Sequence, residues 1–149
     1  DKLKDALSVS QLCNELFPND WTTLLLLGDL FLKNNQEGEA LIYYKQAVSF
    51  FSNIEEEQIS LLGAIGSQFI EASRLNDAEL VLNLNTEIFP NDCNSYDNYA
   101  FILDKNNKLE LAISVQEKAV ALAIEQNHKL LKPLQENLEK LKIKKSTNH

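Results

Sequence analysis

The sequence is poor in the residues on which most catalytic and metal-binding sites depend. Its 149 residues include two histidines, two cysteines, four glycines and no methionine. The four glycines are scattered and form no glycine-rich loop that would hold a phosphate group. His149 ends the chain, and His128 has no cysteine or second histidine at the spacing of metal ligands. The sequence therefore predicts no catalytic residues, no metal and no cofactor, and we do not expect an enzyme.

Long apolar segments and a basic surface are also missing. No stretch approaches the roughly 20 apolar residues that a membrane-spanning helix needs, so membrane insertion is not expected. Acidic residues outnumber basic ones by 22 to 14, which gives a net charge of −8. An acidic surface disfavours nucleic acid, because phosphate binding needs a basic surface that releases counterions.

The C-terminal segment 129–149 is the exception to this acidity, with 6 basic and 2 acidic residues. Four of its basic residues, Lys140, Lys142, Lys144 and Lys145, lie close together in the sequence. We interpret them as the solvated end of a helix, and contact with an acidic partner is the alternative.

The two cysteines do not indicate a site. Cys13 is interpreted as a small residue on the packing side of a helix. Cys93 opens a helix directly after Asp92, where the helix N-terminus favours a thiolate and the neighbouring carboxylate opposes it, so a reactive thiol is the lesser alternative. We expect no disulfide between them, and two cysteines leave the compartment open.

One spacing of apolar and small residues recurs three times. Each copy has two large apolar residues three apart, then glycine or alanine, then a large apolar residue, and an alanine nine positions later. The copies are Leu24, Leu27, Gly28, Phe31, Ala40, Tyr44 and Ala47; Leu62, Ile65, Gly66, Phe69, Ala78, Leu82 and Asn85; and Tyr96, Tyr99, Ala100, Leu103, Ala112, Gln116 and Ala119. Helix pairs repeated in this way form a solenoid, and solenoids commonly hold another macromolecule.

This spacing resembles the tetratricopeptide repeat, in which each unit of about 34 residues is a helix–turn–helix. The resemblance implies an all-α fold, a right-handed α-solenoid of antiparallel helix pairs with a C-terminal capping helix. Gly28, Gly66 and Ala100 then lie on the first helix of each unit, where the second helix crosses closely. A larger side chain at these positions would push the two helices apart.

The repeat phase also predicts the organisation of the chain. Residues 5–20 (DALSVSQLCNELFPND) match residues 77–92 (DAELVLNLNTEIFPND), so we expect the chain to begin inside the second helix of a repeat and to be a segment of a longer protein. We expect one domain, 1–149. Its predicted parts are a partial repeat 1–20 (second helix only), repeats 21–54, 55–92 (with a four-residue extension) and 93–126, and a capping helix and tail 127–149.

Helix signals refine these boundaries. The expected helices cover about 3–17, 21–34, 37–51, 54–73, 76–89, 93–106, 109–126 and 128–144. Ser52 followed by Glu55 predicts a capping box, and the extra residues are expected to extend the helix that follows. Pro133 is tolerated only if it lies in the first turn of the last helix.

The resemblance also implies a binding surface, because the first helix of each repeat lines the concave face in this family. The matching positions are Thr22, Leu25, Asp29, Leu32 and Lys33; Ser60, Gly63, Ser67, Ile70 and Glu71; and Asn94, Asp97, Phe101, Asp104 and Lys105. The family's carboxylate clamp for chaperone tails needs Lys, Asn and Arg, where this chain has Leu25, Asp29, Asn94 and Asn98. The surface favours instead an extended peptide with apolar anchors and some basic character.

Two functions remain open at this point. The first is a non-catalytic scaffold that binds a peptide or protein segment in the concave groove. The second is a structural or oligomerisation segment, because residues 96–120 also look like repeats appended to the C-terminal side of bacterial enzymes. In that case the partner is a domain outside this sequence.

Overall fold

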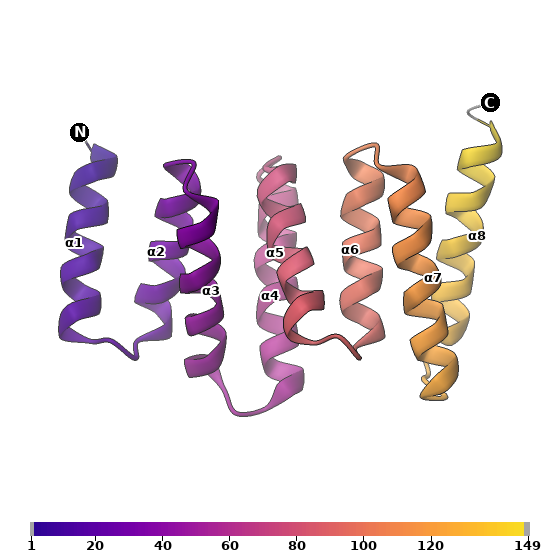
Figure 1. Ribbon diagram of the computed structural model, residues 1–149, viewed down its shortest axis with the longest axis horizontal. Helices are drawn as coiled ribbons and strands as arrows, with labels where there is room; N and C mark the ends of the chain where they lie inside the picture. Colours follow the sequence, from indigo (N-terminus) through magenta and orange to yellow (C-terminus); the bar gives the residue numbers. More distant parts are fainter. Residues whose placement is uncertain (1, 148–149) are drawn as a thin grey trace. The chain divides into compact units, whose positions relative to one another are not determined.

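The computed structural model describes residues 2–147, which form eight α-helices and no strand (Figure 1). The helices are α1 (Lys2–Leu16), α2 (Trp21–Lys33), α3 (Glu37–Phe51), α4 (Glu55–Glu71), α5 (Leu75–Ile88), α6 (Cys93–Lys105), α7 (Leu109–Glu125) and α8 (Leu131–Thr147). The all-α prediction is confirmed. None of the helices within residues 2–147 is long and apolar enough to cross a membrane.

The chain divides into two compact units, residues 1–61 and 62–149, and the boundary falls within α4. Within each unit, consecutive helices run in opposite directions (Figure 1). The predicted single domain and its repeat boundaries stay predictions. Residue 1 of the predicted partial repeat and residues 148–149 of the predicted tail lie outside the described part.

Four of the turns between helices end the preceding helix in the same way. Each has one residue in the left-handed region, with φ between 50° and 60°: Asn35, Ser73, Asn107 and Asn127. At the first turn, the Gln36 N–H donates to the Phe31 carbonyl and the Asn35 N–H donates to the Leu32 carbonyl, both at 2.9 Å. This is a Schellman motif, which needs one residue in the left-handed conformation. Asparagine adopts that conformation at low energetic cost.

The two Phe-Pro-Asn-Asp segments form the turns before α2 and α6. The last aspartate of each segment is the N-cap of the helix that follows. The Asp20 carboxylate accepts hydrogen bonds from the backbone N–H groups of Thr22 and Thr23. The Asp92 carboxylate accepts one from the Ser95 N–H at 2.7 Å. These bonds satisfy backbone donors that the helix leaves unpaired. Hydrogen bonds from the side chains of Thr23 and Thr22 lower the pKa of Asp20.

The junction before α4 differs from the predicted capping box. Ser52 ends α3, and its hydroxyl accepts from the Ile54 N–H at 3.0 Å rather than from Glu55. The Gln58 side chain fills part of the junction by donating to the Ser52 carbonyl at 2.6 Å. α4 has 17 residues, whereas α2 and α6 have 13.

The predicted close crossings lie where the small residues are. A Cβ placed on Gly28 would lie 2.8 Å from Cε1 of Tyr44, and one on Gly66 would lie 2.6 Å from Leu82. Both distances are too short for a real contact, so only glycine permits this approach of the second helix. Ala100 is fully buried on α6 at the corresponding position.

α8 covers the last repeat in the second unit, as a capping helix does. Its Leu134 is 2% exposed and packs with Cys93, Tyr96, Ala119 and further residues of α6 and α7. Pro133 is the third residue of α8, so its missing N–H falls in the first turn, where it is tolerated.

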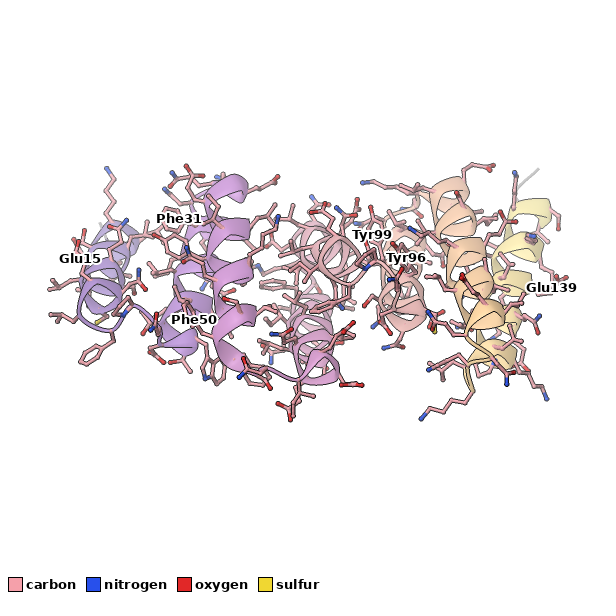
Figure 2. The ribbon with its side chains drawn as sticks, turned by 60° about the horizontal axis from the view of Figure 1, so that its bottom comes forward. Glu15, Phe31, Phe50, Tyr96, Tyr99 and Glu139 are labelled. Carbon is pink, nitrogen blue, oxygen red and sulfur yellow. The ribbon has the colours of Figure 1, made fainter. Side chains whose placement is uncertain are left out.

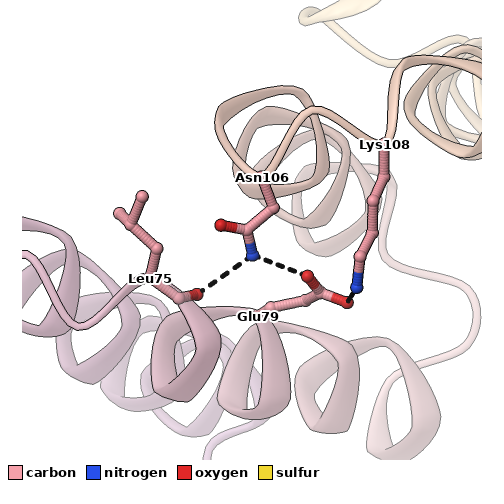
Figure 3. Close-up of polar contacts among 4 residues, drawn as sticks. All are labelled: Leu75, Glu79, Asn106 and Lys108. Atoms are coloured by element: carbon pink, nitrogen blue, oxygen red, sulfur yellow. Dashed lines mark hydrogen bonds and ion pairs between the residues drawn. The ribbon is translucent and has the colours of Figure 1, made fainter.

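Polar contacts join α5 to the turn between α6 and α7 (Figure 3). The Asn106 side chain donates to the Leu75 carbonyl at 3.3 Å and to the Glu79 carboxylate at 2.6 Å. Lys108 donates to the other oxygen of Glu79 at 2.6 Å, and this bond raises the pKa of Lys108. Neighbouring repeats of the second unit are therefore fixed by hydrogen bonds as well as by apolar packing.

Candidate functional site

The second unit contains a hollow of about 560 Å³. Residues from α4, α5, α6, α7 and α8 line it. The residues are Gly63, Ser67, Ile70, Leu82, Asp97, Asn98, Phe101, Asp104, Gln116, Asn137, Lys140, Leu141 and Lys144. We call this hollow the groove. Its volume falls within the range of about 300–1,000 Å³ that is typical of ligand pockets.

Three helices line the groove with the same residue spacing. Each contributes side chains at positions i, i+4 and i+7, which lie on one face of an α-helix. These stripes are Gly63, Ser67 and Ile70 on α4; Asp97, Phe101 and Asp104 on α6; and Asn137, Leu141 and Lys144 on α8. The first two stripes are 34 residues apart, which is one repeat, whereas the α8 stripe follows after 40 residues. The capping helix therefore takes part in the groove in a shifted register.

A polar network fixes one part of the groove. One oxygen of Asp97 accepts from the Gln116 side chain at 2.7 Å and from the Asn137 side chain at 3.0 Å. Gln116 is 1% exposed and also donates to the Leu134 carbonyl at 3.2 Å. Because a buried amide needs its partners, this network holds α6, α7 and α8 in one arrangement.

Charged groups lie on opposite sides of the groove. Asp104 on α6 pairs with Lys144 on α8, with 2.6 Å between the ammonium nitrogen and the carboxylate oxygen. Lys140 lies one turn before Lys144 and makes no hydrogen bond or ion pair within residues 2–147. The lining thus contains two carboxylates and two ammonium groups.

The apolar part of the lining consists of Ile70, Leu82, Phe101 and Leu141. Phe101 is 52% exposed, which is unusual for a phenylalanine, and the Lys105 ammonium lies 5.2 Å from the centre of its ring. This apolar surface is open to a bound side chain.

The groove contains some of the predicted binding residues and adds others. Ser67, Ile70, Asp97, Phe101 and Asp104 line it, as does Gly63 from the same predicted surface. Glu71 is exposed and Asn94 is half-buried, and neither lines it. The predicted binding surface did not contain Gln116 or the residues of α8, and Asn98 was noted only as a mismatch to the carboxylate clamp.

Lys105 of α6 does not line the groove either, and the remaining predicted positions belong to the first unit. Leu32 is 5% exposed, so it is part of the core and does not form the expected apolar spot. Asp29 is half-buried and accepts a hydrogen bond from the Tyr44 hydroxyl at 2.7 Å. Leu25 is half-buried and Lys33 is exposed.

The cysteines provide no reactive group in the second unit. Cys93 is 1% exposed, and burial together with the charge of Asp92 raises the pKa of its thiol. Its sulfur lies 3.5 Å from Nδ1 of His128, which also accepts from the Leu130 N–H at 3.3 Å. The contact joins α6 to the turn between α7 and α8, and a thiol with a raised pKa is a poor nucleophile at neutral pH.

The first unit has a different feature, an apolar stripe on α1. Val9, Leu12, Leu16 and Phe17 are between 55% and 65% exposed. Their counterparts in the matching segment 77–92 include Val81, Leu84 and Phe89, which are 0%, 1% and 6% exposed. The same sequence pattern is thus buried in α5 and uncovered in α1.

Comparison with known protein families identifies two of the repeats. Two stretches, residues 22–53 and 94–123, match the tetratricopeptide repeat family. These stretches are tetratricopeptide repeats. They comprise the helix pairs α2–α3 and α6–α7, so the recognition made from the spacing is confirmed. Arrays of tetratricopeptide repeats are scaffolds for protein interaction and are typically not enzymes.

Solved structures to which the chain is similar include MamA and YrrB. A crystal structure of MamA has a TM-score of 0.45 and 16% identity, covering 98% of this chain and 90% of MamA. MamA from Desulfovibrio magneticus RS-1, residues 41 to the end, has a TM-score of 0.42 and 18% identity, covering 97% of both chains. YrrB, a TPR protein with an unusual peptide-binding site, has a TM-score of 0.42 and 15% identity, covering 94% of this chain and 78% of YrrB. No curated protein sequence matches the chain.

Proposed function

We propose that the chain is a non-catalytic scaffold whose groove in the second unit binds a peptide segment of another protein. The observation that carries this proposal is the groove itself, with an exposed Phe101 beside other apolar residues and a fixed polar network. Binding sites commonly combine apolar walls with a few well-placed polar groups. Phe101 provides the apolar anchor, and Asn98 is placed to bond the peptide backbone.

The charges of the groove refine the predicted ligand. The carboxylates of α6 alone favour a basic peptide, but Lys144 pairs with Asp104 and Lys140 adds a second positive charge. We therefore propose that apolar side chains dominate the affinity and that the charges select the register of the peptide.

A matched pair of glycines tests this proposal. Gly63 lines the groove, and a Cβ there would lie 3.7 Å from the Asn98 amide, whereas a Cβ at Gly38 on α3 would meet nothing within 4 Å. Gly63→Leu places a leucine side chain in the groove at a position where a Cβ is tolerated. Gly38→Leu is the control, because it makes the same substitution on a helix that does not line the groove.

The probe is a set of peptides selected from a displayed peptide library on the unmodified chain. We expect Gly63→Leu and Phe101→Ala to weaken the selected peptides by at least about tenfold, which corresponds to ~1.4 kcal/mol, and Gly38→Leu to leave them unchanged. Circular dichroism shows whether each variant is folded. Peptides that bind all three variants equally place the binding surface elsewhere.

The α1 stripe favours a second candidate, a segment that packs against another copy or against a domain of a larger bacterial protein. Uncovered apolar stripes often mark such interfaces. The test is light scattering on the native chain and on Leu12→Glu/Leu16→Glu, with the exposed polar pair Ser8→Glu/Gln11→Glu as control. Self-association that only the leucine variant abolishes supports an interface between copies, and a monomeric native chain contradicts it.

A further inference from the structure

α8 is attached to the repeats in two different ways along its length. Its first half packs through Leu134, which is buried, and through the partly buried Leu131 and Leu138. In its second half, Leu141 is half-buried and Ile143 is 53% exposed, so apolar packing is slight.

Ion pairs replace apolar packing in the second half. Lys144 pairs with Asp104 on α6 at 2.6 Å. Two further lysines pair with α7 in the same way: Lys142 with Glu117 at 2.9 Å, and Lys145 with Glu110 at 2.7 Å. The lysine side chains are between 43% and 47% exposed, so the ions of the solvent reach all three pairs.

This same half of α8 is a wall of the groove. Lys140, Leu141 and Lys144 line the groove, and they lie within the segment whose attachment is mainly ionic. Asn137, at the end of the first half, remains fixed by its bond to Asp97. A change that releases the lysines therefore loosens one side of the groove while the polar network persists.

We propose that the second half of α8 is an electrostatic latch, residues 139–147, through which ionic strength regulates the groove. Salt screens exposed charge pairs, and raising sodium chloride from about 20 mM to about 500 mM shortens the Debye length from ~20 Å to ~4 Å. The latch loosens under these conditions, whereas the apolar first half of α8 stays in place. Removing the lysine charges has the same effect as salt.

A consequence for binding rests on the proposed function. A peptide that contacts the closed groove binds the latched state better, so salt weakens its binding even when the peptide carries no charge. Ordinary apolar binding shows the opposite tendency or none, because salt does not screen apolar contacts. The salt dependence of an uncharged peptide is therefore diagnostic of the latch.

Native-state hydrogen exchange, read by mass spectrometry, tests the latch without any ligand. We expect exchange in residues 139–147 to become about tenfold faster at the higher salt concentration, with residues 93–105 of α6 unchanged. Lys144→Gln/Lys145→Gln is expected to show faster exchange already at low salt and a smaller further response, because only the Lys142–Glu117 pair remains. Lys129→Gln/Lys132→Gln removes one charge just before α8 and one in its first turn, neither of which makes an ion pair within residues 2–147, and it is expected to behave like the native chain.

A charge swap separates the ion pair from other effects of the substitutions. Lys144→Asp speeds exchange, and adding Asp104→Lys restores part of the protection if the pair itself holds the segment. Exchange in residues 139–147 that does not respond to salt overturns the latch, whatever the groove binds. Salt-dependent exchange together with failure of the Gly63→Leu test leaves the latch standing and removes the proposed function.

Discussion

At the scale of single residues, the clearest constraint is the space between paired helices. Tyr44 is fully buried, and its ring lies 2.8 Å from where a Cβ on Gly28 would be. The sequence indicated that Gly28 has a structural role, because glycine in the interior of a helix is unfavourable unless the packing requires it. The physical reason for the glycine is the approach of the neighbouring helix.

Gly28→Ala is expected to destabilise the protein by about 1–3 kcal/mol, because the Tyr44 ring has to move out of a packed core. Gly38→Ala is the matched control and is expected to stabilise by up to about 1 kcal/mol, since it places alanine in a helix with no neighbour within 4 Å. Urea unfolding followed by circular dichroism measures both. Equal stability of the two variants would contradict the close crossing.

The thiol of Cys93 gives a second prediction at this scale. Because burial and then Asp92 raise its pKa, the folded chain holds the thiol proton at pH values where the unfolded chain has released it. The contribution to stability is therefore complete below the pKa of an unfolded cysteine and is lost as the pH rises through the folded value. We expect iodoacetamide at pH 8 to modify Cys13, which is half-buried, faster than Cys93. Peptide mass spectrometry measures the two rates, and equal rates contradict the protection of Cys93.

At the scale of helices, local signals were enough to predict most of the fold. Aspartates at 20 and 92 and asparagines at 35 and 107 cap helix ends by contacts within a few residues, so the sequence contains the necessary information. The Ser52 junction was not predicted correctly, because the Gln58 side chain joins the end of α3 from within α4.

The groove was only partly predictable for a related reason. Ser67 and Phe101 follow from the repeat phase, whereas Asn137 and Lys144 belong to a helix outside that phase. Their place in the groove depends on how α8 packs, and the buried bond from Gln116 to the Leu134 carbonyl takes part in that packing. The repeat spacing alone therefore does not show which residues of α8 face the groove.

The packing of α8 leads to a prediction about Leu134. Leu134→Ala is expected to cost about 2–5 kcal/mol, because it opens a cavity among Cys93, Tyr96 and Ala119. Leu111→Ala on α7 is the control, since Leu111 is 45% exposed and little is expected to change. Thermal unfolding measures both variants, and a mild effect at Leu134 would show that α8 is not a structural cap.

Deleting residues 131–149 removes the whole of α8 and is expected to have a larger effect than Leu134→Ala. It removes the cover from Ala119, Val120 and Ala123, and we expect aggregation or fraying of α6 and α7, because a terminal repeat needs a polar cover. Size-exclusion chromatography with light scattering detects the aggregates. A soluble, monomeric and equally stable truncated chain is incompatible with the capping role.

At the scale of the whole molecule, the distribution of charge leads to an expectation about nucleic acid as a partner. The positive charge is concentrated in α8, and its lysines at 142, 144 and 145 already pair with carboxylates of α6 and α7. A further lysine, Lys118, contacts Tyr96, which is labelled in Figure 2. Its ammonium lies 2.6 Å from the Tyr96 hydroxyl and 4.2 Å from the centre of the ring. Lys129, Lys132 and Lys140 make no such pair within residues 2–147, but they belong to a chain whose net charge is −8.

We therefore expect no binding to labelled DNA or RNA at a salt concentration of about 150 mM, as measured by fluorescence anisotropy, because counterion release requires a basic surface and the chain has a net charge of −8. The informative variant is Asp104→Asn/Glu110→Gln/Glu117→Gln, which frees the three paired lysines and changes the net charge from −8 to −5. This variant is expected to bind nucleic acid weakly at low salt and to lose it as salt rises, whereas the native chain binds under neither condition. Micromolar binding by the native chain would mean that the ion pairs of α8 open readily for an external phosphate, and the balance of charge would then not exclude nucleic acid as a partner.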